Sequence, residues 1–379
     1  MTATPPDAPA GRATGLLVHE WIAPAGGSEN VLEAMARAFP EADVQCLWND
    51  APARLADRML RETWMARTPI RRQKALAAAF CLPTWRFLPP REYEWMLISS
   101  HLFAHHARVR SPAGDVPKYV YVHTPARYVW APEHDPRGQG PGVRAVAPLF
   151  RALDRRRAAE PVGLAANSAF VQDRIRHAWG REAVVIPPPI DVAAIADVDG
   201  WARRLTASEH RLLETLPVTF LLGASRFTSY KRLDLVIATA ERAGVPAVIA
   251  GRGPDEAALR ERASTANVPV TVIVSPSDAL LRALYRAAAV LVFPAIEDFG
   301  IIPVEAQVLG TPVVTGPVGG QVETYQAGRT GITAVHLDAD ALAAAVWEAM
   351  SLPAFDGPSA TARFATQIFE DRIRRFVTG

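Results

Sequence analysis

Short apolar segments alternate with helix-like segments along this chain, in two blocks that Pro187-Pro188-Pro189 separates. The apolar segments of the first block are 15–20, 42–47, 95–99, 118–122, 163–166 and 183–186. Those of the second block are 218–223, 247–251, 270–274, 290–293 and 312–315. Parallel strands need a crossover between them, which a helix usually supplies. The alternation therefore predicts an α/β fold with two Rossmann-like domains, which we expect to face a cleft.

Composition places the domain boundaries. Residues 1–14 are rich in Pro, Ala and Thr and predict a disordered lead. The first domain is expected over 15–190 and the second over 191–360, with the polar stretch to about Glu214 as a connector. Apolar residues recur at helical spacing from Phe364 to Phe376 in the tail, 361–379, which predicts a last helix.

Charge and cysteine content narrow the compartment and the partners. The 41 basic and 39 acidic residues leave a formal charge of +2, so nothing in the total calls for a nucleic-acid partner. Cys46 and Cys81 are too few for a disulfide framework. Neither a secretory signal nor an apolar stretch of about 20 residues is visible. We expect a cytoplasmic protein, with peripheral contact at the inner face of the cell membrane left open.

Two acids bracket the end of a predicted strand in the second block. Glu297 lies in the loop after the strand 290–293, and Glu305 lies at the start of the following helix, near Pro303. Ligands of open α/β sheets bind at this edge. Two carboxylates there could accept hydrogen bonds from the hydroxyls of a hexose and a ribose; an exposed loop acid and a helix-dipole Glu are the plainer alternative.

Two cations follow the first strand of the second block. Arg226 and Lys231 lie between that strand and the next helix. Cations at a helix N-terminus can neutralise a diphosphate as it leaves a sugar. Two solvated side chains are the alternative reading.

Glycines and one histidine occupy the ends of other strands. Gly251 and Gly253 form a turn after 247–251, and Gly26-Gly27 opens a helix after 15–20, so both could approach an anion closely. His123 directly follows the strand 118–122 and is expected to face the same cleft.

Three histidines and two Asp-x-Asp pairs could suggest metal sites, but we expect other roles for them. His101, His105 and His106 lie close together in sequence, but we see no carboxylate or cysteine near them, and we expect surface or packing roles. Asp197-Val198-Asp199 and Asp338-Ala339-Asp340 lie in the connector and at a helix start, and we interpret both as incidental.

Together these elements resemble the retaining glycosyltransferases of family 4, which have the GT-B fold. The resemblance extends from about Gly15 to the tail, and its strongest pieces are Glu297…Glu305 and Arg226…Lys231. The His-Glu-Trp sequence followed by Gly-Gly, Ser99-Ser100-His101 and the segment 123–130 look most like bacterial mannosyltransferases of O-antigen and polysaccharide assembly.

The resemblance implies a role for each candidate residue. The second domain would bind a nucleotide sugar and the first domain the acceptor, and the tail helix would return to the first domain. Arg226 and Lys231 would hold the donor diphosphate, Glu305 the ribose and Glu297 the hexose. His123 would approach the reacting carbon. The remaining donor contacts implied by the resemblance come from Gly26, Gly27, Gly251, Gly253, Phe299, Gly300 and Ile301.

The expected activity is metal-independent, cofactor-free transfer of a hexose with retention of configuration. The first choice of donor is GDP-mannose, and the acceptor is expected to be lipid-linked or an oligosaccharide. Val274-Ser275-Pro276 stands where many members have a glycine beside the base, so the nucleobase is not fixed and a UDP-linked donor stays open. We expect the acceptor on 63–88, an aromatic and basic stretch that includes Trp64, Arg71, Arg72 and Trp85. A sugar-nucleotide epimerase and a nucleotide-sugar-binding protein without turnover are the alternatives.

Overall fold

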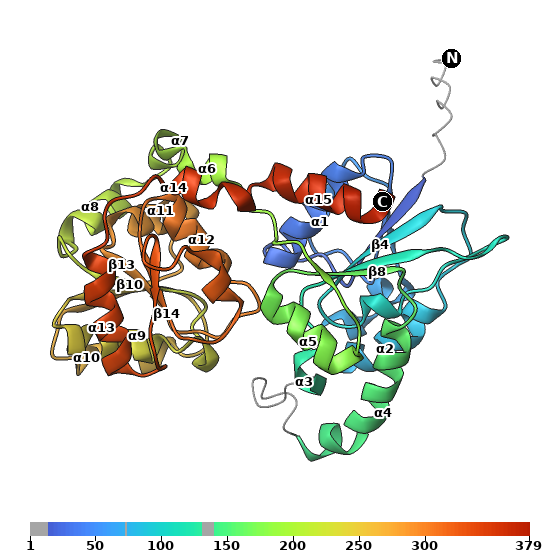
Figure 1. Ribbon diagram of the computed structural model, residues 1–379, viewed down its shortest axis with the longest axis horizontal. Coiled ribbons are helices and arrows are strands. Elements are labelled where there is room, and N and C mark those ends of the chain that lie inside the picture. Colours follow the sequence, from blue (N-terminus) through green and yellow to red (C-terminus); the bar gives the residue numbers. More distant parts are fainter. Residues whose placement is uncertain (1–13, 73, 131–139) are drawn as a thin grey trace. The chain divides into compact units, whose positions relative to one another are not determined.

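The computed structural model describes residues 14–72, 74–130 and 140–379, so the predicted lead at 1–13 lies outside the described residues. The chain forms two compact units (Figure 1). The first comprises the described residues up to Ala166, Gln172–Ile186 and Glu370–Gly379. The second comprises Asn167–Val171 and Pro187–Phe369.

The first unit is built on a parallel sheet with the strand order β3-β2-β1-β4-β7-β8-β9. Its strands are β1 (Gly15–His19), β2 (Asp43–Cys46), β3 (Leu60–Glu62), β4 (Trp95–Ser100), β7 (Lys118–Val122), β8 (Gly163–Ala166) and β9 (Val184–Val185). A separate hairpin pairs β5 (Arg110–Ser111) with β6 (Gly114–Asp115). The central strands are buried on both faces, as parallel sheets require.

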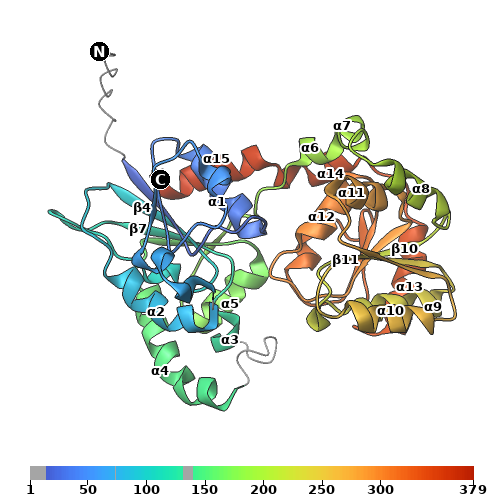
Figure 2. The same cartoon turned by 180° about the vertical axis from the view of Figure 1, so that it is seen from behind.

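Helices cover both faces of this sheet. Figures 1 and 2 show α1 and α15 on one face and α2 and α4 on the other. The helices are α1 (Gly27–Ala38), α2 (Lys74–Arg86), α3 (Arg127–Trp130), α4 (Pro141–Ala158), α5 (Ala169–Trp179), which begins in the second unit, and α15 (Thr366–Thr378), which ends in the first. Within the first unit, Glu370 of α15 accepts a hydrogen bond from Arg37, and the ring of Phe376 contacts Tyr119 edge-on. The tail helix therefore ends against the first unit, as expected.

The second unit contains another parallel sheet, with the order β12-β11-β10-β13-β14-β15. Its strands are β10 (Leu221–Ala224), β11 (Ala247–Gly251), β12 (Val270–Val274), β13 (Val290–Phe293), β14 (Val313–Thr315) and β15 (Gly331–Thr333). The helices of this unit are α6 (Val192–Ala196), α7 (Val198–Ala202), α8 (Ala207–Thr215), α9 (Leu233–Ala243), α10 (Glu256–Ser264), α11 (Asp278–Ala287), α12 (Ile301–Val308), α13 (Ala339–Met350) and α14 (Gly357–Thr361). α9, α10 and α13 cover one face and α11 and α12 the other (Figures 1 and 2).

Both sheets have one strand order in common. Counted from the first strand of each unit, the order begins 3-2-1-4, as in a doubly wound fold, and the direction of winding reverses beside the first strand. The crevice outside the carboxyl ends of β1 and β4, and of β10 and β13, is the place where such sheets bind ligands. The two Rossmann-like domains predicted from sequence are confirmed.

The structure differs from the prediction in three places. The stretch expected to be a connector forms α6, α7 and α8, and α8 begins with a capping box in which Thr206 and Glu209 bond each other's backbone N–H groups. Strands β3, β5, β6 and β15 were not predicted. Serine is a common N-cap residue, so the sequence suggests Ser28 as the N-cap of the first helix, but Ser28 lies inside α1, whose N-cap is Gly26.

The cysteines and the acidic pairs named from the sequence have simple structural explanations. Cys46 and Cys81 are both buried free thiols. Asp197 and Asp338 cap α7 and α13, which accounts for the acidic pairs that contain them. Among the described residues, no helix combines the length and the hydropathy that a bilayer crossing would need.

Candidate functional site

Charged side chains gather at the switch point of the second sheet. Arg226 follows β10, and Glu297 follows β13, its neighbour in the sheet. Lys231 ends a short 3₁₀ turn before α9 and is buried, which brings its ammonium group to the Glu297 carboxylate as an ion pair. Tyr230 supports both cations: its hydroxyl accepts a hydrogen bond from Arg226, and its ring lies 5.0 Å from Lys231 Nζ.

Gln321 positions the loop that carries Glu297. It is buried, and its side-chain Oε1 accepts a hydrogen bond of 3.0 Å from the backbone N–H of Glu297. The backbone N–H of Gly320 donates in turn to the Glu297 carbonyl at 2.8 Å. The carboxylate is therefore held beside Lys231 by backbone bonds as well as by charge.

A cavity of about 520 Å³ opens beside the cations, at the carboxyl ends of β10, β11 and β12. Its lining comes from Ala224, Ser225, Arg226, Ala250, Gly251, Arg252, Ser275, Pro276, Ser277, Asp278, Leu281, Tyr285 and Ile302. Of these, only Arg226, Gly251 and Ser275 were singled out from sequence. A cavity of this size is in the usual range for small-molecule sites.

Glu305 is connected to this cavity by Tyr285, which lines it. The Tyr285 hydroxyl donates to Glu305 Oε2 at 3.3 Å. Burial raises the pKa of Glu305 to about 7, against a partial opposing effect of the Tyr285 hydrogen bond. Glu305 therefore changes charge near neutral pH, and a ligand hydroxyl that donates to the carboxylate would favour its ionised form.

The predicted Gly-rich turn is explained by backbone packing. Gly251 has φ +156°, and a Cβ there would lie 1.8 Å from the carbonyl oxygen of Ser225. A Cβ on Gly253 would lie 2.3 Å from the carbonyl oxygen of Phe227. Both glycines thus let this turn press against the loop that carries Arg226, and Gly251 also lines the cavity.

Ser275 occupies a backbone conformation that favours glycine. Its φ is +51°, in the left-handed region, and its backbone N–H donates to the Gly251 carbonyl at 2.7 Å. The position where the resemblance implies a glycine beside the base is therefore a left-handed residue at the cavity wall.

The segment Phe299-Gly300-Ile301 opens α12. Gly300 is its N-cap with φ +101°. The Phe299 side chain is buried against Phe364 and other apolar residues, with ring centroids 5.5 Å apart. Because the side chain is buried, the donor contact that the resemblance implies for Phe299 would have to be made by its backbone.

Polar side chains also gather at the switch point of the first sheet. His19 ends β1, and Ser99 lies opposite it in β4. The Ser99 hydroxyl is 3.1 Å from His19 Nδ1 and 2.8 Å from Nε2 of His123, which follows β7. Burial, followed by the neighbouring His101 and His19, lowers the pKa of His123 to about 3. The strand-end position predicted for His123 is confirmed.

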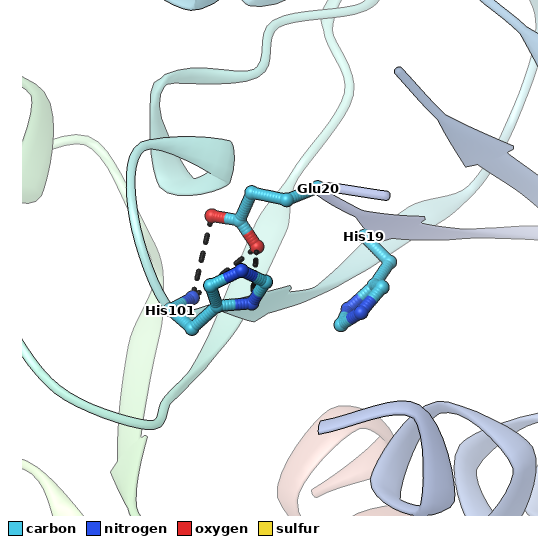
Figure 3. Close-up of side chains that lie close together, drawn as sticks. All are labelled: His19, Glu20 and His101. Atoms are coloured by element: carbon cyan, nitrogen blue, oxygen red, sulfur yellow. Dashed lines mark hydrogen bonds and ion pairs between the residues drawn. The ribbon is translucent and has the colours of Figure 1, made fainter. Parts of the chain in front are cut away.

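Glu20 follows His19 and is fully buried. Its Oε1 accepts backbone hydrogen bonds from Leu102 at 2.9 Å and Ala104 at 2.8 Å, and its Oε2 lies 3.1 Å from His101 Nδ1. Figure 3 shows the carboxylate directed at the His101 backbone and ring, and the His19 ring, whose centroid is 5.4 Å from that of His101, has no dashed contact with either residue. Burial acts to raise the pKa of Glu20, but His101, His19 and the backbone donors lower it overall.

A second buried carboxylate lies nearby. Asp154 Oδ1 is 2.9 Å from Nε2 of both His105 and His106, and its Oδ2 accepts from the indole N–H groups of Trp130 and Trp179 at 2.7 Å. The expectation that no carboxylate accompanies these histidines is wrong, because Glu20 and Asp154 come from distant parts of the chain. Each cluster offers donor atoms within 4.8 Å of one another, yet hydrogen bonds within the protein already account for both carboxylates.

Gly26 and Gly27 begin α1 as predicted. The carboxylate of Glu29 lies behind them, accepting from the Ala23 backbone N–H at 3.1 Å and from the Ser28 hydroxyl at 2.8 Å. A Cβ on Gly26 would lie 2.1 Å from Glu29 Oε2. The glycines therefore keep this loop close to a buried acid.

A further cavity, of about 580 Å³, lies beside the ends of β2 and β3. Trp64 and Phe87 line it and are 50% and 82% exposed, and Arg61 and Arg91 add positive charge. It overlaps the stretch 63–88 expected to hold the acceptor. Trp85 is fully buried, so its assignment to that surface is wrong.

Residues that sequence reasoning missed are mostly partners from distant segments: Gln321, Tyr285, Ser277 and Asp154. Ser277 carries a local signal, because it caps α11 and its hydroxyl accepts from Leu280 at 3.1 Å. For the other three residues, no short-range sequence pattern predicts the contact.

Two family matches together cover most of the chain. Residues 25–194 match "Glycosyltransferase Family 4", and residues 211–366 match "Glycosyl transferases group 1". The first match falls mainly on the first unit and the second on the second unit. The chain thus matches one family model in each unit, in this order.

Curated relatives match at low identity. A "GDP-mannose-dependent alpha-(1-6)-phosphatidylinositol monomannoside mannosyltransferase" from Mycolicibacterium smegmatis is 31% identical over 205 residues, which are 49% of this chain and 52% of the relative. An "Alpha-1,3/1,6-mannosyltransferase alg-2" from Neurospora crassa is 26% identical over 44% of each chain. The chain spans about half the length of these curated relatives.

A solved structure matches the whole fold. Anabaena Alr3699/HepE in complex with UDP has a TM-score of 0.69 and 18% identity, with 96% of this chain and 98% of that chain covered. At this identity the likeness shows the fold alone, and that fold is GT-B.

Proposed function

We propose that this chain is a metal-independent glycosyltransferase of family 4 that moves a hexose from a nucleotide sugar to an acceptor and retains the anomeric configuration. GDP-mannose is the first candidate donor, and a lipid-linked or oligosaccharide acceptor is the first candidate partner. The matches to "Glycosyltransferase Family 4" and "Glycosyl transferases group 1" support the reaction class.

One observation carries the proposal. Arg226 and the Lys231–Glu297 pair flank the switch point of the second sheet, beside a cavity of about 520 Å³. The cations suit a diphosphate, and Glu297 suits the hydroxyls of the attached sugar. Glu305, at the cavity wall through Tyr285, suits the ribose.

In the proposed reaction the bond between the hexose carbon and the diphosphate oxygen breaks, and a bond from that carbon to the acceptor oxygen forms on the same face. The acceptor proton passes to the departing phosphate oxygen, so no protein nucleophile is required. Arg226 and Lys231 stabilise the charge that develops on the diphosphate. Glu297 and His123 orient the hexose.

The donor assignment draws on the curated relatives. Both curated relatives described above are named mannosyltransferases, and one is named GDP-mannose-dependent. A UDP-hexose is the second candidate donor, because the matched fold is also known from HepE in complex with UDP-glucose.

We place the acceptor at the cavity lined by Trp64 and Phe87. Exposed aromatic rings beside Arg61 and Arg91 suit a sugar face or the head group of a lipid carrier, at the inner face of the cell membrane. Trp64→Ala should raise the KM for the acceptor and leave donor hydrolysis unchanged. An unchanged acceptor KM would contradict this placement, and sedimentation with anionic vesicles tests the membrane contact.

The donor proposal is tested with purified protein and a panel of GDP- and UDP-linked hexoses. We expect one donor to raise the melting temperature and to release nucleoside diphosphate slowly, and faster with an acceptor extract. Arg226→Ala should abolish the stabilisation. Arg260→Ala is the matched control, because Arg260 is an exposed arginine on α10 that forms an ion pair with Glu256.

The outcomes separate the alternatives. Binding without nucleoside diphosphate release under any condition favours a binding protein without turnover. Conversion of the sugar without transfer favours an epimerase. Equal stabilisation in Arg226→Ala and Arg260→Ala would contradict the assigned site.

A further inference from the structure

We infer that His19 and Ser99 act as positioning residues that fix His123 in one tautomer, with its proton on Nδ1 and a lone pair on Nε2. This inference deepens the proposed function, because it specifies how His123 would meet the donor sugar. It is argued from a hydrogen-bonded row of three side chains that come from three neighbouring strands.

The row has a simple geometry. β1, β4 and β7 are adjacent, and His19 and Ser99 are paired in register. The Ser99 hydroxyl lies 3.1 Å from His19 Nδ1 on one side and 2.8 Å from His123 Nε2 on the other. The His123 backbone N–H donates to the Ser100 carbonyl at 2.8 Å, so one hydrogen bond fixes the His123 backbone and the Ser99 contact fixes its ring.

Each ring in this row carries one proton near neutral pH. Burial, with His101 as a second cause, lowers the pKa of His19 to about 4, and burial lowers that of His123 to about 3. A neutral imidazole has one N–H donor and one bare nitrogen. The single hydroxyl proton of Ser99 can serve only one of the two rings, so the other ring must donate to the hydroxyl oxygen.

Two arrangements satisfy that condition. In the first, His19 Nδ1–H donates to Ser99, and Ser99 donates to His123 Nε2. In the second, His123 Nε2–H donates to Ser99, Ser99 donates to His19 Nδ1, and His19 carries its proton on Nε2.

The surroundings of His19 decide between them. His19 is fully buried, and its Nε2 has no hydrogen-bond partner within the described part of the chain. The Glu20 carboxylate lies within 4.8 Å of the His19 ring, but its hydrogen bonds go to the backbone N–H groups of Leu102 and Ala104, and Figure 3 shows its dashed contacts on His101. A buried N–H without an acceptor is rarer and costlier than a buried bare nitrogen. The first arrangement is therefore favoured, and it leaves the His123 proton on Nδ1.

The consequence concerns the chemistry of His123. With its proton on Nδ1, the ring is a hydrogen-bond donor at Nδ1 and an acceptor at Nε2, and the Nε2 lone pair is committed to Ser99. His123 then orients oxygen atoms through a fixed N–H group and does not serve as a base through Nε2.

The test reads the tautomer directly. Protein labelled with ¹⁵N in its histidine rings gives two-bond ¹H–¹⁵N correlation patterns that differ between tautomers, and the His123 signal is identified by its loss in His123→Gln. In the wild-type protein we expect the Nδ1–H pattern. In Ser99→Ala the pattern should shift toward Nε2–H or a mixture, and Ser99→Thr, which keeps a hydroxyl, should retain the wild-type pattern.

Ser100→Ala is the matched control. Ser100 is the next residue of the same strand, and its hydroxyl faces Glu20 and His105 instead. The His123 pattern should survive this change. Thermal melting of all variants identifies any that fail to fold. A wild-type Nε2–H pattern, or an unchanged pattern in folded Ser99→Ala, overturns the inference.

Activity supplies a second readout. Ser99→Ala should lower kcat/KM for the donor roughly tenfold, which corresponds to one hydrogen bond, and Ser99→Thr should restore it. Wild-type kcat/KM in a Ser99→Ala protein whose tautomer has shifted overturns the role in orienting the donor. The tautomer is read without substrate, so failure of the proposed transferase activity and failure of this inference are distinguishable.

Discussion

The Lys231–Glu297 ion pair offers the sharpest test of the second unit, through a double-mutant cycle of Lys231→Ala, Glu297→Gln and both together. The Lys231 side chain is 9% exposed and the Glu297 side chain 18% exposed. Breaking a fully buried pair costs about 3–5 kcal/mol, because it leaves one charge without a partner. Water still reaches part of Glu297, so we expect each single substitution to lower the free energy of unfolding by about 2 kcal/mol.

That loss should be visible in melting. A loss of about 2 kcal/mol corresponds to roughly 4–8 °C for a domain of about 150–250 residues. The double variant should lose less free energy of unfolding than the two single variants together, by about 1–2 kcal/mol, because each second substitution also removes the charge that the first one left behind. Arg242 and Asp340 provide a matched control, since their side chains pair at 3.2 Å but are 64% and 76% exposed.

Denaturant unfolding of the four proteins measures the coupling, and Arg242→Ala with Asp340→Asn should give a coupling below about 0.5 kcal/mol. Nucleoside diphosphate at about 100 times its Kd should stabilise the wild-type protein by about 2.7 kcal/mol, and Lys231→Ala should lose most of this. Additive effects of Lys231→Ala and Glu297→Gln, within about 0.5 kcal/mol, would refute the reasoning.

Three further substitutions test other parts of the structure. Because Glu305 holds its proton more tightly when folded, with a pKa raised from 4.5 to about 7, the free energy of unfolding should fall as pH rises through that window. Glu305→Gln should remove this slope in urea titrations at several pH values, and an unchanged slope would contradict the burial of the acid. Gly251→Ala places a Cβ 1.8 Å from the Ser225 carbonyl oxygen and should lower stability by about 3 kcal/mol or more, whereas Gly244→Ala, with open space around it, should cost about 1 kcal/mol; equal melting temperatures would contradict the close approach. Asp154→Asn turns an amide toward N–H donors that need an acceptor and should cost about 3–5 kcal/mol, and a melting curve like that of the wild-type protein would show that the network contributes little.

Local patterns in the sequence predicted most of the fold, since each central strand is a continuous apolar run. The strands that were missed are short: β3 and β15 have three residues each, and β5 and β6 have two each, too few for a periodic pattern to show. The helix α8 was missed although its capping box, Thr206 with Glu209, is visible in the sequence. There the polar composition of the segment outweighed the capping signal.

The candidate site was predictable where a residue lies within a few residues of the carboxyl end of a strand. Arg226, Glu297 and His123 do so, and a parallel sheet gathers such residues at one edge. The partners were not predictable, because they depend on tertiary packing. Glu20 binds backbone N–H groups some 80 residues away, and Asp154 belongs to an arginine-rich helix whose neighbours suggest a solvated face.

The two switch points differ in charge, and the proposed function gives each of them a use. In the second unit, Arg226 and Lys231 stand beside the cavity, where an anionic diphosphate needs opposite charge. In the first unit, burial keeps His19 and His123 neutral, with pKa values of about 4 and 3. A neutral ring of fixed tautomer offers one directed N–H to a sugar oxygen and carries no positive charge that would attract a phosphate. Burial of the first cluster is therefore as necessary to the proposed division of labour as the exposed charge of Arg226 is to the second.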